Sequence, residues 1–203
     1  ALTNYYVAWS DENFSLTAGS CYEQFGSGLL FRAYEDRTLG MNNAVMGARF
    51  TYHYQDILGI KAIWGMPRMG MTYSDTQVRG GDISFMISSL AGWQATTLAL
   101  EGSVLNRYEA LTVDLKGEGA RPNQTGFSGR LNFEHNGFTL KGEYIDAGER
   151  HYPNSAYDGK NDPRPDLIKN GNAQLIEAGY SGHGLGVNVA ARRLEYMDCP
   201  IIY

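Results

Sequence analysis

The chain has 203 residues with 22 acidic and 17 basic side chains, which gives a formal net charge of −5. This balance argues against nucleic acid as a partner, because phosphate binding needs a basic face. Two cysteines are too few for a disulfide scaffold, and nothing in the sequence requires Cys21 and Cys199 to pair. The 25 glycines exceed the usual share of about 7% and, with the 14 tyrosines, favour an all-β protein with many hairpins.

Apolar and polar side chains alternate along several segments, as they do in strands with one apolar and one polar face. The clearest pair of segments flanks Asn136-Gly137, and Asn-Gly is the strongest short hairpin signal. The pattern predicts about ten strands, paired as five hairpins, in one domain at residues 1–203 or in a fragment of one. In chain order the strands are expected at residues 5–10, 14–25, 44–53, 58–64, 82–88, 96–103, 126–134, 138–146, 174–180 and 185–191.

Residues 83–100 need separate treatment, because 18 residues without a charge are long enough for a helical membrane span. The segment contains six Ser, Thr or Gln residues and is interrupted by Ala91-Gly92-Trp93. We therefore expect two strands joined by a tight turn rather than a membrane helix.

Short and long connections alternate along the chain. The tight turns centre near residues 12, 55, 91, 136 and 182, whereas the segments near 26–43, 66–77, 106–125 and 147–172 are long and polar. All short turns therefore fall at one end of the strand pairs. This asymmetry is typical of an up-and-down antiparallel transmembrane β-barrel, whereas Greek-key sandwiches have long connections at both ends.

Charged side chains within the strands decide which face could meet lipid. An arginine or lysine on the lipid face at the bilayer midplane costs about 2–4 kcal/mol, so these charges should face the barrel lumen. Arg193 does not fit this pattern, because its register places it on the apolar face, where it would need a bulge or an interface position. The predicted lumen-facing residues are Arg32, Arg49, Lys61, Glu101, Arg130, Glu134, Lys141 and Glu143.

Aromatic residues gather near both ends of the predicted strands. Two aromatic girdles that flank an apolar band suit the two interfaces of a membrane. The residues assigned to the girdles are Trp9, Tyr52, Trp64, Trp93, Phe133, Phe138, Tyr144 and Tyr180.

Residues 22–43 read YEQFGSGLLFRAYEDRTLGMNN. This run resembles an uncharacterised family of outer-membrane β-barrels from Bacteroidota, whose pattern is F/Y-E-Q-F-G-x-G-L-x-x-R-x-Y-E-D-R followed by L-G-x-D/N-N. Its motif residues here are Glu23, Gly26, Gly28, Arg32, Glu35, Asp36 and Arg37. The resemblance implies a barrel fold in the bacterial outer membrane and no reaction. Members of that family are longer than 203 residues, which favours a chain that is part of a larger barrel. The alternative is a barrel formed by these ten strands alone.

The motif glycines allow a bend or bulge in a long strand, and the motif charges are close enough in sequence to form an ion-pair network. Two interpretations stay open for this network. It either forms a constriction or plug anchor in the lumen, or it fixes the first outer loop.

No catalytic motif or metal-ligand spacing is present, so we expect no enzyme activity, cofactor or metal site. The carboxylates near residues 146–166 do not match an EF-hand and are read as part of a solvated loop. The sequence thus predicts a barrel that contacts the lipid bilayer and other envelope proteins, either as a porin-like channel or as the barrel subunit of an envelope complex. The alternative is a soluble secreted β-sandwich that binds carbohydrate through loop tyrosines and Trp64 or Trp93.

Overall fold

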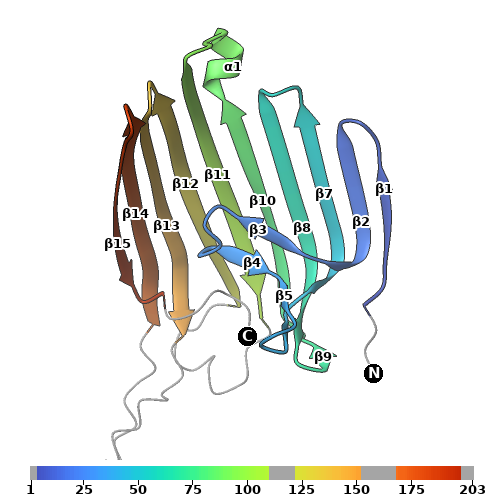
Figure 1. Ribbon diagram of the computed structural model, residues 1–203. Coiled ribbons are helices and arrows are strands. Elements are labelled where there is room, and N and C mark those ends of the chain that lie inside the picture. The colour runs from blue at the N-terminus through green and yellow to red at the C-terminus, as the bar shows by residue number, and fades with distance from the viewer. Residues whose placement is uncertain (1–3, 110–121, 152–167, 198–203) are drawn as a thin grey trace, which may run out of the picture.

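The computed structural model describes residues 4–109, 122–151 and 168–197 (Figure 1). Ten antiparallel strands follow one another in an up-and-down order in one large sheet, which confirms the predicted all-β class and antiparallel order. The strands are β1 (Tyr6–Ser10), β2 (Phe14–Cys21), β7 (Val45–Tyr54), β8 (Leu58–Met69), β10 (Gln77–Met86), β11 (Thr96–Tyr108), β12 (Asn123–His135), β13 (Phe138–His151), β14 (Ile168–Gly182) and β15 (Leu185–Glu195). A short strand, β9 (Thr72–Tyr73), pairs with the end of β8.

The short connections all lie at one end of the sheet, at the top in Figure 1. Three of them use a residue in the left-handed region, with φ near 50° at Gln55, Asn136 and His183. The connection between β10 and β11 differs from the predicted tight turn, because residues 87–91 form the helix α1 (Ile87–Ala91). Gly92 ends this helix at φ 68°, where its N–H reaches the carbonyl groups of Ser88 and Ser89. No helix among the described residues is long and apolar enough to cross a membrane.

The prediction of one continuous strand over residues 14–25 is wrong, because the chain leaves the large sheet after Cys21. Residues 23–33 instead form a separate hairpin, which we call the inner hairpin. It consists of β3 (Glu23–Phe25) and β4 (Phe31–Ala33). A second small hairpin follows, made of β5 (Glu35–Asp36) and β6 (Met41–Asn42). Gly26 and Gly28, at φ 53° and 88°, shape the turn of the inner hairpin, a conformation that side chains with a Cβ rarely adopt.

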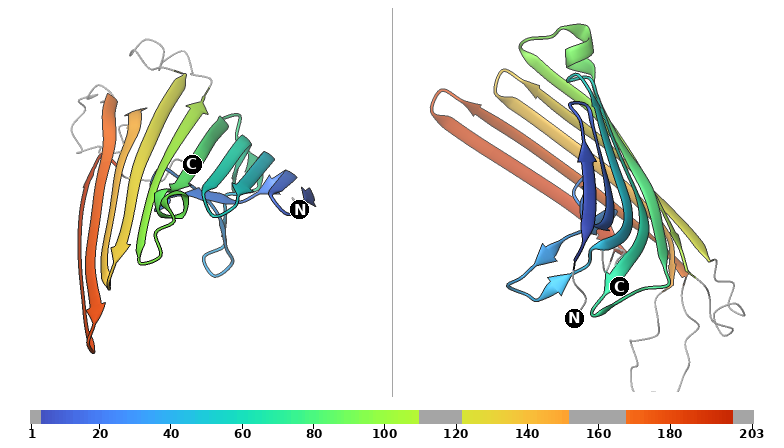
Figure 2. Two further views of the ribbon diagram at one scale, coloured as in Figure 1. Left: turned by 90° about the horizontal axis from the view of Figure 1, so that it is seen from above. Right: turned by 90° about the vertical axis from the view of Figure 1, so that its right-hand side faces the viewer.

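The large sheet is curved, and the inner hairpin lies against its concave face (Figures 1 and 2). In the described residues β1 pairs only with β2 and β15 only with β14, so the sheet has two open edges. The predicted closure of these strands into a barrel is therefore not found. The arrangement is an open, curved sheet with a hairpin on its inner side.

The buried core lies between the inner hairpin and the concave face. Phe25, Leu30 and Phe31 of the hairpin are fully buried. The sheet residues that pack with them come from strands between β2 and β14, among them Cys21, Val45, Ile63, Val78, Leu105, Ile145 and Ala173. Alternate residues of the same strands point to the convex face, where most large apolar side chains are exposed. The hairpin thus supplies the packing that a single sheet lacks.

Glycines in the sheet make room for the inner hairpin. A Cβ atom at Gly80 would lie 3.0 Å from the Phe25 ring, and one at Gly126 would lie 2.9 Å from Leu30 Cδ1. Both distances are shorter than real Cβ contacts normally are. Because glycine has no Cβ atom, the inner hairpin can lie close to the sheet at these two positions.

We expect Gly126→Ala to lower the thermal unfolding midpoint of the purified protein, because overpacking costs about 1–3 kcal/mol. Gly129→Ala on the same strand is the matched control, since a Cβ atom there meets nothing within 4 Å. Unfolding followed by circular dichroism checks both variants, and equal midpoints would contradict the close fit of the hairpin.

Candidate functional site

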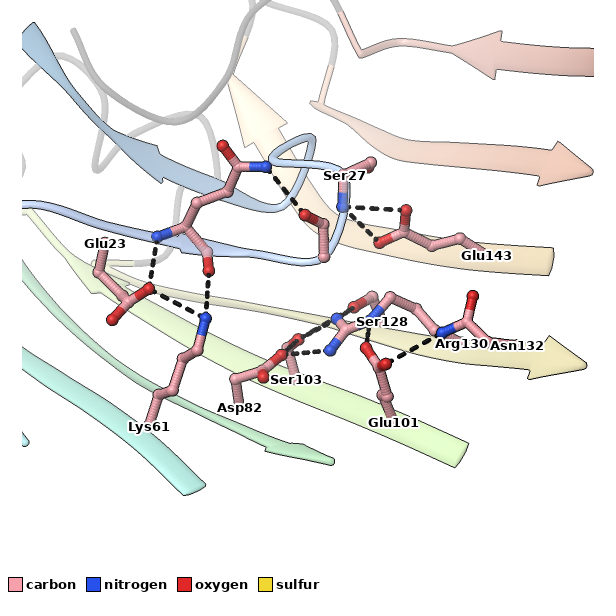
Figure 3. A network of polar contacts seen from close by, with 12 residues as sticks. Glu23, Ser27, Lys61, Asp82, Glu101, Ser103, Ser128, Arg130, Asn132 and Glu143 are labelled. Carbon is pink, nitrogen blue, oxygen red and sulfur yellow. Dashed lines mark hydrogen bonds and ion pairs between the residues drawn. The ribbon is translucent and has the colours of Figure 1, made fainter. Parts of the chain in front are cut away.

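The polar side chains of the concave face gather along the side of the inner hairpin that faces the short turns. Below them lies the apolar core, and above them the concave face is open (Figure 1). Three groups of contacts make up this site: one at Glu23, one at Arg130 and one at the hairpin tip (Figure 3).

Glu23 ties the first strand of the hairpin to β7 and β8. Its carboxylate accepts hydrogen bonds from Arg49 Nε at 2.7 Å and from Lys61 Nζ at 3.2 Å. The N–H of Gln24 donates to the same carboxylate at 2.9 Å. Burial opposes ionisation of Glu23, but these hydrogen bonds and the charges of Lys61 and Arg49 outweigh it, so its pKa lies below the usual value. The carboxylate is therefore ionised at neutral pH.

Arg130 is the centre of the second group, on β12. Its guanidinium pairs with Asp82 on β10 and donates from Nε to Glu101 on β11 at 2.7 Å. The hydroxyl groups of Ser103 and Ser128 accept from its Nη1 at 2.6 Å and 3.2 Å, and Ser103 donates to Asp82 at 2.7 Å. Every polar group of this buried cluster thus has a partner, which is the condition for burying charge.

The hairpin tip lies on Glu143 of β13. The Ser27 N–H donates to the two carboxylate oxygens of Glu143, at 3.2 Å and 3.4 Å. A Cβ atom at Gly26 would lie 2.3 Å from Glu143 Oε1 and 2.7 Å from Arg130 Nη1. The tip therefore needs glycine at this position both for its φ angle and for its close approach to the charged residues of the sheet.

A cavity of about 350 Å³ lies beside the tip, between the hairpin and strands β11 to β14. Its charged lining residues are Glu101, Arg130, Lys141, Glu143 and Glu177. Because charges of both signs line it, the cavity suits water, ions or small polar solutes better than an apolar ligand.

The residues predicted to face the lumen share one face of the structure. Seven of them stand in register with buried concave residues such as Thr51, Ile63, Ser103, Ser128 and Ile145. These seven are Arg49, Lys61, Glu101, Arg130, Glu134, Lys141 and Glu143. Arg32 lies instead on the exposed side of the inner hairpin, with its guanidinium 4.2 Å from the centre of the Tyr34 ring. Whether this face lines a lumen stays a prediction.

The motif residues form the two small hairpins, but they do not pair with one another as expected. In the described part of the chain, Arg37 with Glu35 at 3.5 Å is the one ion pair between motif residues. Glu23 pairs with Arg49 and Lys61 of the sheet instead. The motif thus attaches the inner hairpin to the sheet.

Seven of the eight predicted girdle residues lie on the convex side. Trp9, Tyr52, Trp64, Phe133, Phe138, Tyr144 and Tyr180 alternate with concave positions in their strands, and Trp93 follows α1. Three pairs are in ring contact near the short turns: Trp9 with Phe14 at 5.0 Å, Phe133 with His135 at 6.5 Å, and Phe138 with Tyr180 at 4.6 Å. Their position at membrane interfaces stays a prediction.

The sequence did not single out Asp82, Ser103 and Ser128, although they occupy the polar positions of alternating segments.

The convex face also holds charges near the long connections. Arg79 donates to Asn106 at 2.9 Å, and Arg193 pairs with Glu195 at the end of β15. Arg193 thus needs no bulge, because it lies where the apolar surface ends.

Among the described residues no group of three side chains could hold a metal ion. Cys21 is buried as a free thiol, and Cys199 lies outside the described residues. Most of the loop carboxylates and tyrosines of 147–172 also fall outside them.

Comparison with known proteins places this architecture in a family. The model described as "Family of unknown function (DUF6029)" matches residues 1–201. The chain belongs to the DUF6029 family. No curated protein and no solved structure matches it. Because the DUF6029 match spans nearly the whole chain, the inner hairpin and the sheet belong to the same family unit.

The contacts of Glu23 make the folding stability of this DUF6029 protein depend on pH. A carboxyl group with a lowered pKa stabilises the fold fully above its usual value near 4.5, and this contribution is lost as the pH falls through the lowered value. We expect Glu23→Gln to cost about 1.5–3 kcal/mol at pH 7, as for other hydrogen bonds to charged groups. The difference in stability between this variant and wild type should shrink once the pH falls below the ordinary carboxyl pKa near 4.5.

Thermal unfolding between pH 3 and pH 8 measures this difference. Glu35→Gln is the matched control, since Glu35 belongs to the exposed second hairpin and should change the midpoint little. A Glu23→Gln variant as stable as wild type at pH 7 would show that the hairpin does not depend on these ion pairs.

Proposed function

We propose that this chain forms part of the wall of an outer-membrane β-barrel, and that its concave face lines a porin-like channel narrowed by the inner hairpin. The observation that carries the proposal is the chemistry of the convex face. Large apolar side chains are exposed there along neighbouring strands, among them Trp64, Ile83, Leu100, Val104, Phe127, Leu140 and Ile176. A soluble protein rarely exposes so continuous an apolar surface, whereas a barrel presents one to lipid.

The distribution of charge on the convex face supports the same orientation. Its described charged side chains, Arg68, Arg79, Asp146, Glu149, Arg193 and Glu195, all lie in the halves of their strands next to the long connections. An apolar band therefore extends from these residues toward the short turns. A soluble β-sandwich, the alternative considered from the sequence, would bury its apolar side chains between two sheets.

The open edges of the sheet favour a barrel with more than these ten strands. In lipid each unpaired backbone group costs several kcal/mol, so neither edge can remain free in a membrane. The edge of β15 is 11 residues long, whereas β1 has 5 residues. If β15 paired with β1, about half of the β15 edge would still lack a partner. We therefore expect further strands to close the barrel.

The inner hairpin is a fixed part of this channel rather than a mobile gate. Phe25, Leu30 and Phe31 are fully buried, and burial of each side chain contributes about 1.5–3 kcal/mol. Together with the ion pairs of Glu23, this packing holds the hairpin in place. The same packing favours a second candidate function, in which the filled barrel is a structural subunit of an envelope complex and does not conduct.

Two measurements on the full-length protein test these proposals. A closed barrel resists denaturing detergent until it is boiled, so unboiled and boiled samples of outer membranes should migrate differently on a gel. Equal migration, with the protein in the soluble fraction, would overturn the barrel. Conductance in a planar bilayer then separates the two functions, because a structural subunit leaves the bilayer insulating.

We expect Leu100→Arg to impair insertion of the full-length protein into lipid vesicles, because arginine on the lipid face costs about 2–4 kcal/mol near the midplane. Thr97→Arg on the same strand is the matched control. Thr97 is exposed on the concave face, where a charge can meet water. The folded fraction is read from the gel shift, and equal insertion of both variants would contradict a lipid-facing convex surface.

A further inference from the structure

The inner hairpin does not cover the whole concave face. At its own level it buries Ile145 on β13 and Ala173 on β14, which are neighbours across these two strands. Nearer the short turns, Lys141 and Glu177 are also neighbours across β13 and β14, but both are exposed and line the cavity at the hairpin tip. These two residues therefore belong to the part of the concave face beside the tip that the hairpin leaves uncovered.

The other charged residues beside the hairpin have close polar partners. Glu23 binds Arg49 and Lys61, Arg130 binds Asp82 and Glu101, and Glu143 accepts the Ser27 N–H. In contrast, within the part of the chain that the structure describes, neither Lys141 nor Glu177 makes an ion pair or a side-chain hydrogen bond. Their charges are thus available to act on ions in the water beside them.

We propose that Lys141 and Glu177 set the charge selectivity of the channel. This inference rests on the proposed function, since it needs a conducting barrel. An unpaired charge acts on mobile ions within a Debye length of about 8 Å, whereas paired and buried charges contribute little at that range. Lys141 repels cations and Glu177 attracts them, so the two residues nearly balance in the wild-type channel.

Removal of either charge shifts the balance beside the hairpin tip toward the other. Lys141→Gln should make the channel prefer cations, and Glu177→Gln should make it prefer anions. We expect the ratio of potassium to chloride permeability to change roughly threefold in each direction, as one unit charge about 6 Å from the ion path in water would produce. The conductance itself should stay within a factor of about two, since the charge is changed at nearly constant side-chain size.

The experiment uses the full-length protein in planar bilayers, with a potassium chloride gradient across the membrane and the reversal potential as the readout. Arg193→Gln is the matched control, because it removes one positive charge, as Lys141→Gln does, but from the convex face. Each variant is first checked for the wild-type gel shift, which shows that it folds.

Opposite shifts for Lys141→Gln and Glu177→Gln, with no shift for Arg193→Gln, are the expected result. A conducting wild type whose reversal potential is unchanged by both variants would overturn the assignment of these residues while leaving the channel intact. A folded wild-type barrel that does not conduct would instead overturn the channel, and the selectivity with it.

Discussion

Successive side chains of a β-strand point to opposite faces of its sheet, and this geometric constraint organises the whole structure. Strand after strand places apolar residues on the convex face, whereas the concave face is apolar beneath the inner hairpin and mostly small, polar or charged elsewhere. A sheet of this kind cannot bury both faces by itself. Its concave face is covered in part by the inner hairpin, and we assign its convex face to lipid.

The inner hairpin connects packing with function. Its apolar side chains fill the space above Gly80 and Gly126, and its charged and backbone groups bind the polar residues of the sheet at Arg49, Lys61 and Glu143. Because the inner hairpin is inserted between the neighbouring strands β2 and β7, residues that would otherwise lengthen their connection lie on the concave side. Its position leaves Lys141 and Glu177 uncovered, which is why they carry the proposed selectivity.

Local patterns in the sequence were sufficient for most of the long strands, for most of the tight turns and for the face of seven of the eight charged residues assigned to the polar face. Alternation placed Arg49 and Lys141 on the polar face, and Asn136-Gly137 marked its hairpin correctly. The departure of the chain from the sheet after Cys21 could not be predicted, because residues 14–25 alternate like a continuous strand. That departure depends on contacts with distant residues, as does the choice of Arg49 and Lys61 as partners of Glu23. The short helix α1 was missed because residues 83–100 fit two strands equally well.

The orientation of the sheet toward lipid is the central claim, and accessibility along β11 tests it most directly. Single spin labels at residues 97–104 of the full-length protein in lipid vesicles would be probed with oxygen, which enters lipid, and with a water-soluble nickel complex. The account predicts oxygen maxima at Leu98, Leu100, Gly102 and Val104, and nickel maxima at the alternate positions. Strong nickel accessibility at Leu100 and Val104 would show that the convex face meets water, and would contradict the membrane assignment.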